Sequence, residues 1–286
     1  MTKRLAIISD FHMDSNHFSA EDLEVFDQVL QDEKITDLHF AGDISNDFHG
    51  ISEAFLGNLH NKYNVTYNLG NHDMLHLTEN EIANSDFLIK KFESKTLLAF
   101  HGWYDYSFME NSDFDKILRF KNAVYFDRKI HRQFDDIQTT ENILVKLDEI
   151  LSNLTDEIIV ATHFVPHKAF IIDTRYEKFA RFNAYLGSQK FHELFVKYPN
   201  VKTVVFGHAH HRRNAVKLDE ISYHTRPLGY IYEWQMVRDF AQIHQVNLYR
   251  APKKIYHEIR EFPDWQAYYK KNLAAEFRSA LNIFDV

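Results

Sequence analysis

The segment Leu5-Ala-Ile-Ile-Ser-Asp10-Phe-His12 joins a short apolar run to two side chains that can bind a metal ion. Five further apolar runs occur along the chain, and all six are continuous rather than alternating in polarity. This pattern is typical of strands that are covered on both faces of a sheet. The six predicted strands are Leu5–Ser9, Asp37–Ala41, Val65–Leu69, Thr96–Phe100, Ile158–Thr162 and Val201–Phe206.

Helical patterns separate these strands. Ser19-Ala-Glu-Asp22 has the form of a capping box and precedes an apolar stripe, and two further apolar faces of helical spacing lie in 143–151 and 191–198. The alternation of strands with helices predicts an α/β protein. Towards the end of the sequence we expect a strand at Ala241–Leu248 and a helix at Trp265–Leu281.

The composition is that of a globular protein, with 45% hydrophobic and 26% charged residues in 286. Because there are only 8 glycines and 5 prolines, long flexible linkers are not expected, and we predict a single domain over 1–286. The polar and aromatic segment 104–140 interrupts the alternation. It is either an inserted cap or lid, or an ordinary helical connection. From about residue 231 we expect a strand–helix extension of the same domain.

Charge and cysteine content exclude several classes of protein. The formal net charge of −8 argues against a broad basic surface and therefore against long nucleic acid as a partner. The absence of cysteine excludes a thiolate metal site and fits a reducing compartment, so we expect a cytoplasmic protein whose metals have N and O ligands. No apolar run is long enough for a secretory signal or a membrane span. The sequence does not indicate an oligomeric state.

Metal-binding side chains follow five of the six predicted strands. Since the carboxyl ends of parallel strands meet at one edge of a sheet, these side chains are expected to converge on one crevice. Each motif alone is common, but five in this order predict a shared metal site. The motifs are Asp10-Phe-His12, Gly42-Asp43, Gly70-Asn71-His72-Asp73, His163 and Gly207-His208-Ala-His210.

The complete set resembles the motifs of the calcineurin-like metallophosphoesterase superfamily, and the resemblance extends from Asp10 to His210. It implies a four-layer sandwich of two mixed β-sheets flanked by helices, with the site at one edge. It also implies a phosphoesterase that attacks its substrate with a hydroxide held between two metal ions.

The resemblance also implies a role for each residue. One metal would be bound by Asp10, His12 and His210, a second by Asn71, His163 and His208, and both by Asp43. His72 would face the substrate as a general acid. Such a shell of N and O ligands suits divalent transition metals, manganese first, with iron, zinc or cobalt as alternatives.

Substrate-binding residues are less well defined. Trp103 and Tyr104 follow a predicted strand and could either stack on a base or pack within their loop. Arg175, Arg181 and Asn183 could either clamp a phosphate or form ordinary surface interactions.

Departures from related patterns narrow the substrate by exclusion. No Arg soon follows Gly42-Asp43 as in protein Ser/Thr phosphatases, and no Tyr ligand follows it as in purple acid phosphatases. The sequence is more similar to the bacterial phosphodiesterase-type branch. We expect a small phosphorylated substrate, a monoester or a diester, with nucleotides among the candidates. The alternatives are a catalytically weak scaffold or interaction module, and a nuclease acting on short nucleic acid.

Overall fold

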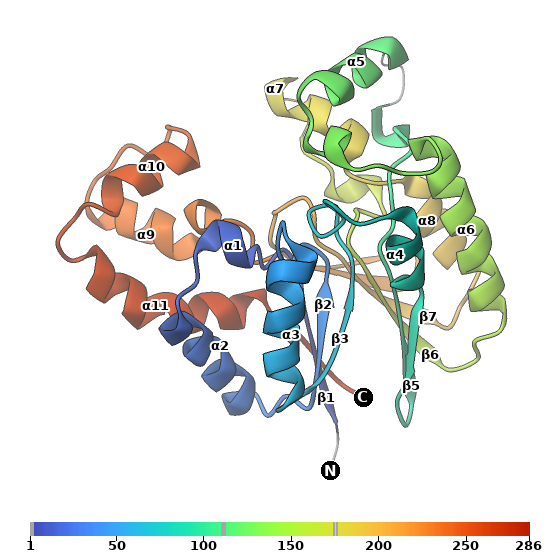
Figure 1. The fold of residues 1–286 in the computed structure, drawn as a ribbon, viewed down its shortest axis with the longest axis horizontal. Helices are drawn as coiled ribbons and strands as arrows, with labels where there is room; N and C mark the ends of the chain where they lie inside the picture. Colours follow the sequence, from blue (N-terminus) through green and yellow to red (C-terminus); the bar gives the residue numbers. More distant parts are fainter. Residues whose placement is uncertain (1–2, 110–112, 174, 176) are drawn as a thin grey trace.

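A computed structural model describes residues 3–109, 113–173, 175 and 177–286 of the chain. Two mixed β-sheets lie at its centre and helices cover their outer faces (Figure 1). The predicted four-layer α/β architecture is thereby confirmed. No helix in the described part of the chain is both long and apolar enough to span a membrane.

The first sheet has four strands and carries the amino-terminal motifs. Strand β1 pairs in parallel with β2, β2 pairs in parallel with β3, and β10 runs antiparallel along the other edge of β1. In sheet order the strands are β10 (Asn282–Asp285), β1 (Arg4–Ile8), β2 (Asp37–Ala41) and β3 (Asn64–Asn68).

The second sheet has six strands. Its centre, from β5 through β6 and β7 to β9, is parallel, whereas β4 and β8 pair antiparallel at the two edges. In sheet order the strands are β4 (Leu88–Lys91), β5 (Lys95–Phe100), β6 (Glu157–Thr162), β7 (Val201–Val205), β9 (Ile221–Thr225) and β8 (Arg213–Leu218).

Strand β1 shows why the apolar runs are continuous. Leu5 and Ile7 belong to a buried cluster that also contains side chains of β5, β6 and β7, so this face packs against the second sheet. Ala6 and Ile8 belong to the larger cluster that includes residues of the helices. Because successive residues of a strand point to opposite faces, both faces of β1 must be apolar.

The helices lie on the outer faces of the sheets and at the edge where the parallel strands end (Figure 1). The predicted capping box is present: Ser19 Oγ accepts from the Asp22 backbone N–H, and Asp22 accepts from that of Ser19. The helices are α1 (Met13–Asn16), α2 (Ala20–Asp32), α3 (Glu53–His60), α4 (Glu79–Asn84), α5 (Phe114–Val124), α6 (Asp136–Ser152), α7 (Glu177–Ala180), α8 (Gln189–Phe195), α9 (Gln235–Ile243), α10 (Pro252–Ile259) and α11 (Trp265–Ala280).

The strand predicted at Ala241–Leu248 is wrong. Its first residues complete helix α9, and the rest form the connection to α10. The physical reason is that Val237, Phe240 and Ala241 are buried at helical spacing. The strand of this region is instead β10, after α11. The edge strands β4 and β8 and the neighbouring β9 are shorter or more polar than the predicted strands and were not recognised.

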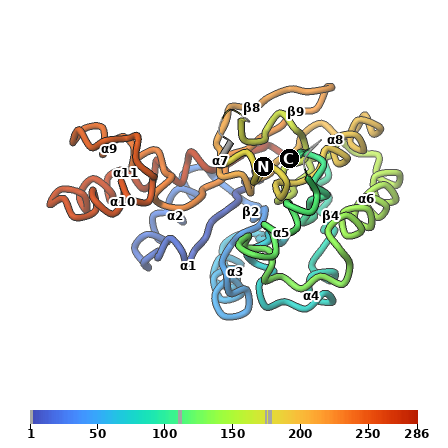
Figure 2. Tube along the Cα trace, turned by 90° about the horizontal axis from the view of Figure 1, so that it is seen from above, coloured from blue at the N-terminus to red at the C-terminus, as the bar shows by residue number. Residues whose placement is uncertain are grey.

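The C-terminal helices α9, α10 and α11 form a layer beside α2, which both views show (Figures 1 and 2). Their core is aromatic: the buried ring of Phe277 in α11 lies 6.1 Å from that of Phe11 and 5.1 Å from that of Phe26. The extension therefore shares a hydrophobic cluster with α2 and the first sheet, and the single domain stays a prediction.

The segment 104–140 forms α5, a 3-10 turn over Phe126–Lys129 and the start of α6. Helix α5 lies above the edge of the sheets where the parallel strands end, with α7 beside it (Figure 1). Part of this segment, 110–112, falls outside the described residues. A cap or lid role for it stays a prediction.

We predict that Phe277→Ala lowers the free energy of unfolding by about 3–5 kcal/mol, because the substitution leaves a cavity among packed rings. The urea-induced transition should remain single, since α11 and the first sheet share this core. Tyr249→Ala, at an exposed position, is the control and should change stability by less than about 0.5 kcal/mol. Separate transitions for the C-terminal helices would contradict the single-domain prediction.

Candidate metal centre

The predicted metal-binding residues lie in loops at the carboxyl ends of the strands. Several of them adopt left-handed backbone conformations, which cost non-glycine residues about 1–2 kcal/mol each. Such strain persists only where the surroundings hold it in place, and it concentrates at functional sites. The residues concerned are Asp10, His12, Asp43, His208 and His210, with φ between 46° and 65°.

Backbone hydrogen bonds between the loops hold these conformations. The Asp10 N–H donates to the Gly42 carbonyl at 3.0 Å, and the His12 N–H donates to that of Asp43 at 2.9 Å. On the other sheet, the Gly207 N–H donates to the His163 carbonyl at 3.1 Å. The loops therefore position one another.

Two groups of side chains offer ligand atoms that lie within 4.8 Å of one another. The first ligand group contains Asp10, His12, Asp43 and His210, and the second ligand group contains Asp43, His163 and His208. Asp43 belongs to both. A carboxylate shared in this way is what two neighbouring cations require.

In the first ligand group the donor atoms converge closely. His12 Nε2 lies 3.0 Å from His210 Nε2, and His210 Nε2 lies 3.1 Å from Asp10 Oδ1. Asp43 Oδ2 is 3.8 Å from His12 Nε2. Asp10, His12 and Asp43 are fully buried, and the side chain of His210 is 15% exposed. The group is therefore reached from the His210 side.

In the second ligand group His163 Nε2 lies 3.3 Å from Asp43 Oδ2 and 3.2 Å from His208 Nδ1. Asn71 Oδ1 is 3.1 Å from the same His163 nitrogen. The Asn71 amide is oriented by its Nδ2, which donates to Asp127 Oδ1 at 2.7 Å. Its oxygen therefore faces the other donor atoms of this group, and its role as a metal ligand stays a prediction.

Three of the imidazoles are oriented through their outer nitrogens. His210 Nδ1 lies 2.8 Å from Glu233 Oε2, His163 Nδ1 lies 3.2 Å from the Ala41 carbonyl, and His208 Nε2 lies 3.1 Å from that of Tyr185. An oxygen acceptor keeps the proton on the outer nitrogen and leaves the inner lone pair free for a metal. The donor set thus fits divalent transition metals.

The buried carboxylates of the site favour positive charge on the groups next to them. Burial opposes protonation, yet Asp43 raises the pKa of His163 to about 9, and Glu233 and Asp10 raise that of His210 well above its ordinary value. Burial lowers the pKa of His208 to about 3. The buried carboxylates thus favour positive charge beside them, which bound cations would supply.

Asp73 ties two of the loops together. Its Oδ2 accepts from the backbone N–H groups of Asp43 at 2.6 Å and Gly70 at 2.8 Å, and its Oδ1 accepts from those of Ile44 and Ser45. Burial and the nearby Asp43 raise the pKa of Asp73 to about 7, although these backbone donors lower it. Asp73 therefore positions Asp43 through the backbone.

His72 lies beside both ligand groups without belonging to either. Its Nδ1 is 2.7 Å from Asn46 Oδ1, and Asn46 Nδ2 in turn donates to Asp14 Oδ2 at 2.8 Å. Its Nε2 is 3.9 Å from Asp43 Oδ2, and the side chain is 15% exposed. Burial lowers the pKa of His72. The free Nε2 thus lies at the entrance to the site.

The aromatic residues predicted to contact substrate are buried in this structure. Trp103 and Tyr104 are fully buried, Trp103 Nε1 donates to Asp136 Oδ1 at 2.8 Å, and the Arg132 guanidinium lies 4.9 Å from the Trp103 ring centre. No face of either ring is open to a ligand. The alternative reading, packing within the loop, accounts for both.

The polar candidates do not gather at the metal centre either. Asn183 is buried, and its amide forms two hydrogen bonds of 2.9 Å with the backbone of Ile172. Arg175 pairs with Asp173 on the surface. The Arg181 guanidinium lies 4.5 Å from the ring centre of Phe120. Arg181 also lines a cavity together with Phe126, and a substrate-binding role for the three residues stays a prediction.

Sequence reasoning missed the residues that orient the ligands and His72. Glu233, Asp127 and Asn46 lie 23, 56 and 26 positions from the side chains they contact. Asn46 stands three residues after Asp43, and this proximity to a ligand was the one available signal. The other two contacts depend on the fold.

Comparison with known proteins identifies the class. The sequence profile of the family "Calcineurin-like phosphoesterase" matches residues 3–212. The chain belongs to this family. Comparison with curated proteins gives no match.

Solved structures share the fold. The phosphopantetheinyl hydrolase of Mycobacterium tuberculosis superposes with a TM-score of 0.63 at 16% identity, over 82% of this chain and 92% of that protein. A dimetal phosphatase from Danio rerio gives a TM-score of 0.47 at 14% identity, over 79% of this chain and 87% of that protein.

We predict that Gly70→Ala disrupts the centre. A Cβ atom at this position would lie 2.2 Å from Asp43 Oδ1 and 2.5 Å from the Asp43 backbone nitrogen, so Asp43 must shift. Bound manganese, measured by mass spectrometry after dialysis, should fall. Gly57→Ala is the matched control, since nothing lies within 4 Å of its Cβ in helix α3. It should keep the metal and gain about 0.5–1 kcal/mol in stability. Full metal retention by Gly70→Ala would argue against the role of Asp43.

Proposed function

We propose that this protein is a phosphoesterase that uses two divalent transition-metal ions, with manganese favoured and iron, zinc or cobalt as alternatives. The observation that carries the proposal is the pair of ligand groups that share Asp43. The mixed set of imidazole, carboxylate and amide donors suits these ions better than magnesium or calcium.

The geometry supports one assignment of ligands. Asp10, His12 and His210 would bind one ion, and Asn71, His163 and His208 would bind the other. Asp43 would bridge the two, because its Oδ2 atom lies near both His12 and His163. When bound, the ions would supply positive charge to the phosphoryl oxygens and the acidity that makes a water molecule nucleophilic near neutral pH.

His72 would act at the leaving group. Hydrolysis adds the water oxygen to phosphorus and breaks the bond from phosphorus to the ester oxygen, which needs a proton as it departs. His72 Nδ1 lies 2.7 Å from Asn46 Oδ1, so Nε2 is the atom that faces the site. In its imidazolium form, His72 would give the Nε2 proton to the leaving oxygen and become neutral. The chain from Asp14 through Asn46 fixes the ring in this orientation.

The alternatives have less support. A scaffold that had lost catalysis would not need a metal-binding side chain at every ligand position. It would also not need histidines whose inner nitrogens converge on a common point. A nuclease for long strands would need a basic surface, and the net charge is −8. A small phosphate ester remains the best substrate class.

We predict that Asp43→Asn reduces bound metal from about two ions per chain, because one carboxylate serves both sites. Manganese content measured by mass spectrometry tests this. Asp115→Asn, on the exposed surface of α5, is the control and should bind as the parent does. Two tightly bound ions in Asp43→Asn would rule out the bridging assignment.

We predict that His72→Ala retains both metals and slows the hydrolysis of bis(p-nitrophenyl) phosphate by roughly 10²–10⁴-fold, as expected for the loss of a general acid. The exposed His49→Ala variant should show the parent rate. Unchanged turnover in His72→Ala, with metal content intact, would exclude this role.

A further inference from the structure

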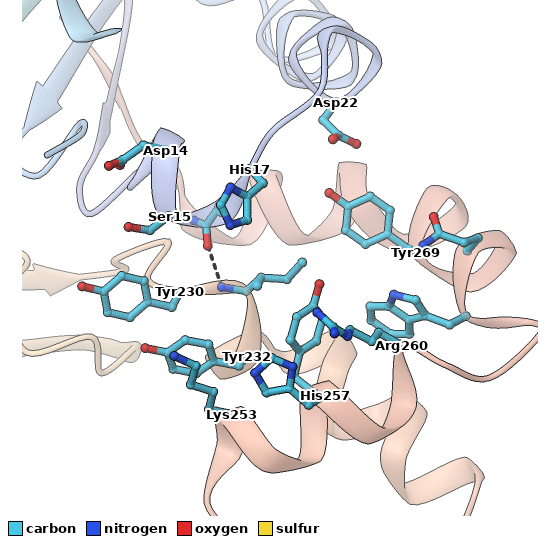
Figure 3. Close-up of a pocket in the computed structure, with 15 residues that line it drawn as sticks. Asp14, Ser15, His17, Asp22, Tyr230, Tyr232, Lys253, His257, Arg260 and Tyr269 are labelled. Carbon is cyan, nitrogen blue, oxygen red and sulfur yellow. Dashed lines mark hydrogen bonds between the residues drawn. The ribbon is translucent and has the colours of Figure 1, made fainter. Parts of the chain in front are cut away.

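A cavity of about 750 Å³ lies between the end of helix α1, residues 14–17, and helices α10 and α11 (Figure 3). We call it the C-terminal cavity. Most of its lining comes from three segments: residues 14–17, 230–232 and 253–269. The family profile ends at residue 212, so two of these segments belong to a part of the chain outside the profile.

The C-terminal cavity adjoins the metal centre through Tyr230. The Tyr230 ring, which lines it, stacks on the ring of His12 with centres 4.3 Å apart and lies 4.9 Å from that of His210. Tyr232 stacks on Tyr230 at 5.2 Å. One side chain therefore separates the cavity from two of the proposed ligands, which is within reach of a substrate with its phosphate at the metals.

One wall of the cavity is basic. One face of α10 lines it, at the spacing of successive helical turns, with Lys253, Tyr256 and His257. Arg260, which directly follows the helix, lies on the same side (Figure 3). Within the described chain neither Lys253 nor His257 has a hydrogen bond or ion pair, and Arg260 has only the exposed Glu261 at 3.1 Å. An exposed pair of this kind is weak. These groups are available to an anion.

The carboxylates of the opposite wall are already engaged. Asp14 accepts from the backbone and side-chain nitrogens of Asn46. Asp22 accepts at the start of α2 and is also hydrogen-bonded to Tyr269. A ligand anion would therefore bind along α10 rather than along this wall.

Aromatic side chains also line the cavity. Tyr230, Tyr232, Tyr256 and Tyr269 contribute to it, and the Trp265 ring is buried behind them. Rings of this kind offer flat apolar surfaces on which a planar ligand ring can stack. The cavity thus combines the two features needed to bind a phosphorylated compound that carries a ring.

A second cavity, of about 660 Å³, adjoins the metal centre through Phe126. Phe126 lines it and stacks on His72 at 3.9 Å, and the rings of His72 and His12 are 4.9 Å apart. Ring contacts thus connect Phe126, which lines this cavity, through His72 and His12 to Tyr230, which lines the C-terminal cavity. A monoester has one organic arm, whereas a diester has two.

We propose that the substrate is a phosphodiester, one arm of which carries a planar ring and a second phosphate that bind in the C-terminal cavity against Lys253 and Arg260. This inference deepens the proposed function and rests on it, because the phosphate that is cleaved lies at the metal centre. The second arm would occupy the cavity beside Phe126.

Two chromogenic diesters test the proposal: the p-nitrophenyl ester of thymidine 5′-phosphate, and the same ester with a 3′-phosphate. The manganese-loaded protein should prefer the second by roughly 10–100-fold in kcat/KM, the range for a charged hydrogen bond. In Lys253→Gln/Arg260→Gln the ratio should fall towards one. Lys254→Gln, a neighbour on α10 outside the lining, should keep it. Lack of preference in the parent, or an unchanged ratio in the double variant, would overturn the proposal.

Binding to the chelator-treated protein separates this proposal from the phosphoesterase assignment. By calorimetry, thymidine 3′,5′-bisphosphate should bind more tightly than thymidine, and the double variant should lose roughly 10–100-fold of that affinity. The control Lys254→Gln should bind the bisphosphate as tightly as the parent does. If no ester is hydrolysed, the phosphoesterase assignment fails, while this dependence on Lys253 and Arg260 still tests the cavity. Equal affinities in parent and double variant would refute an anion site.

Discussion

The Asp43 carboxylate has to serve two groups of ligands at once. It is buried, its Oδ2 lies 3.3 Å from His163 Nε2 and 3.8 Å from His12 Nε2, and these two histidines come from different sheets. Two cations a few ångströms apart repel strongly, and a shared anion offsets that repulsion. The packing of the sheets, the left-handed loop residues and the four backbone donors to Asp73 together place this one group.

The sequence predicted both the strands and the site where metal-binding side chains follow the apolar strands closely. Asp10, Asp43 and His163 follow buried strands directly, so strand order and site could be read together. The polar hairpin of β8 and β9 left no comparable signal. The end of helix α9 and the connection after it were predicted as a strand, because a short apolar run does not by itself distinguish a strand from a helix. Trp103 was correctly placed after a strand, but burial and the hydrogen bond to Asp136 came from a distant helix.

The two parts of the chain, within the family profile and beyond it, contribute differently to the metal centre. Residues within the family profile supply the ligands and His72, and most of the groups that orient them. Glu233 is an exception, since it lies beyond residue 212 and fixes His210 through Nδ1. The C-terminal extension is therefore connected to the metal centre on two counts: it orients a ligand and forms the wall of the adjoining cavity. Tyr230 lies between these two parts, because its ring stacks on that of His12 and also lines the C-terminal cavity.

The shared carboxylate is tested most directly by anomalous diffraction at the manganese edge from crystals grown with that ion. The account predicts two peaks about 3.5–4 Å apart on either side of Asp43, one beside His12 and His210 and the other beside His163 and His208. A single peak, or two peaks that Asp43 does not join, would contradict it.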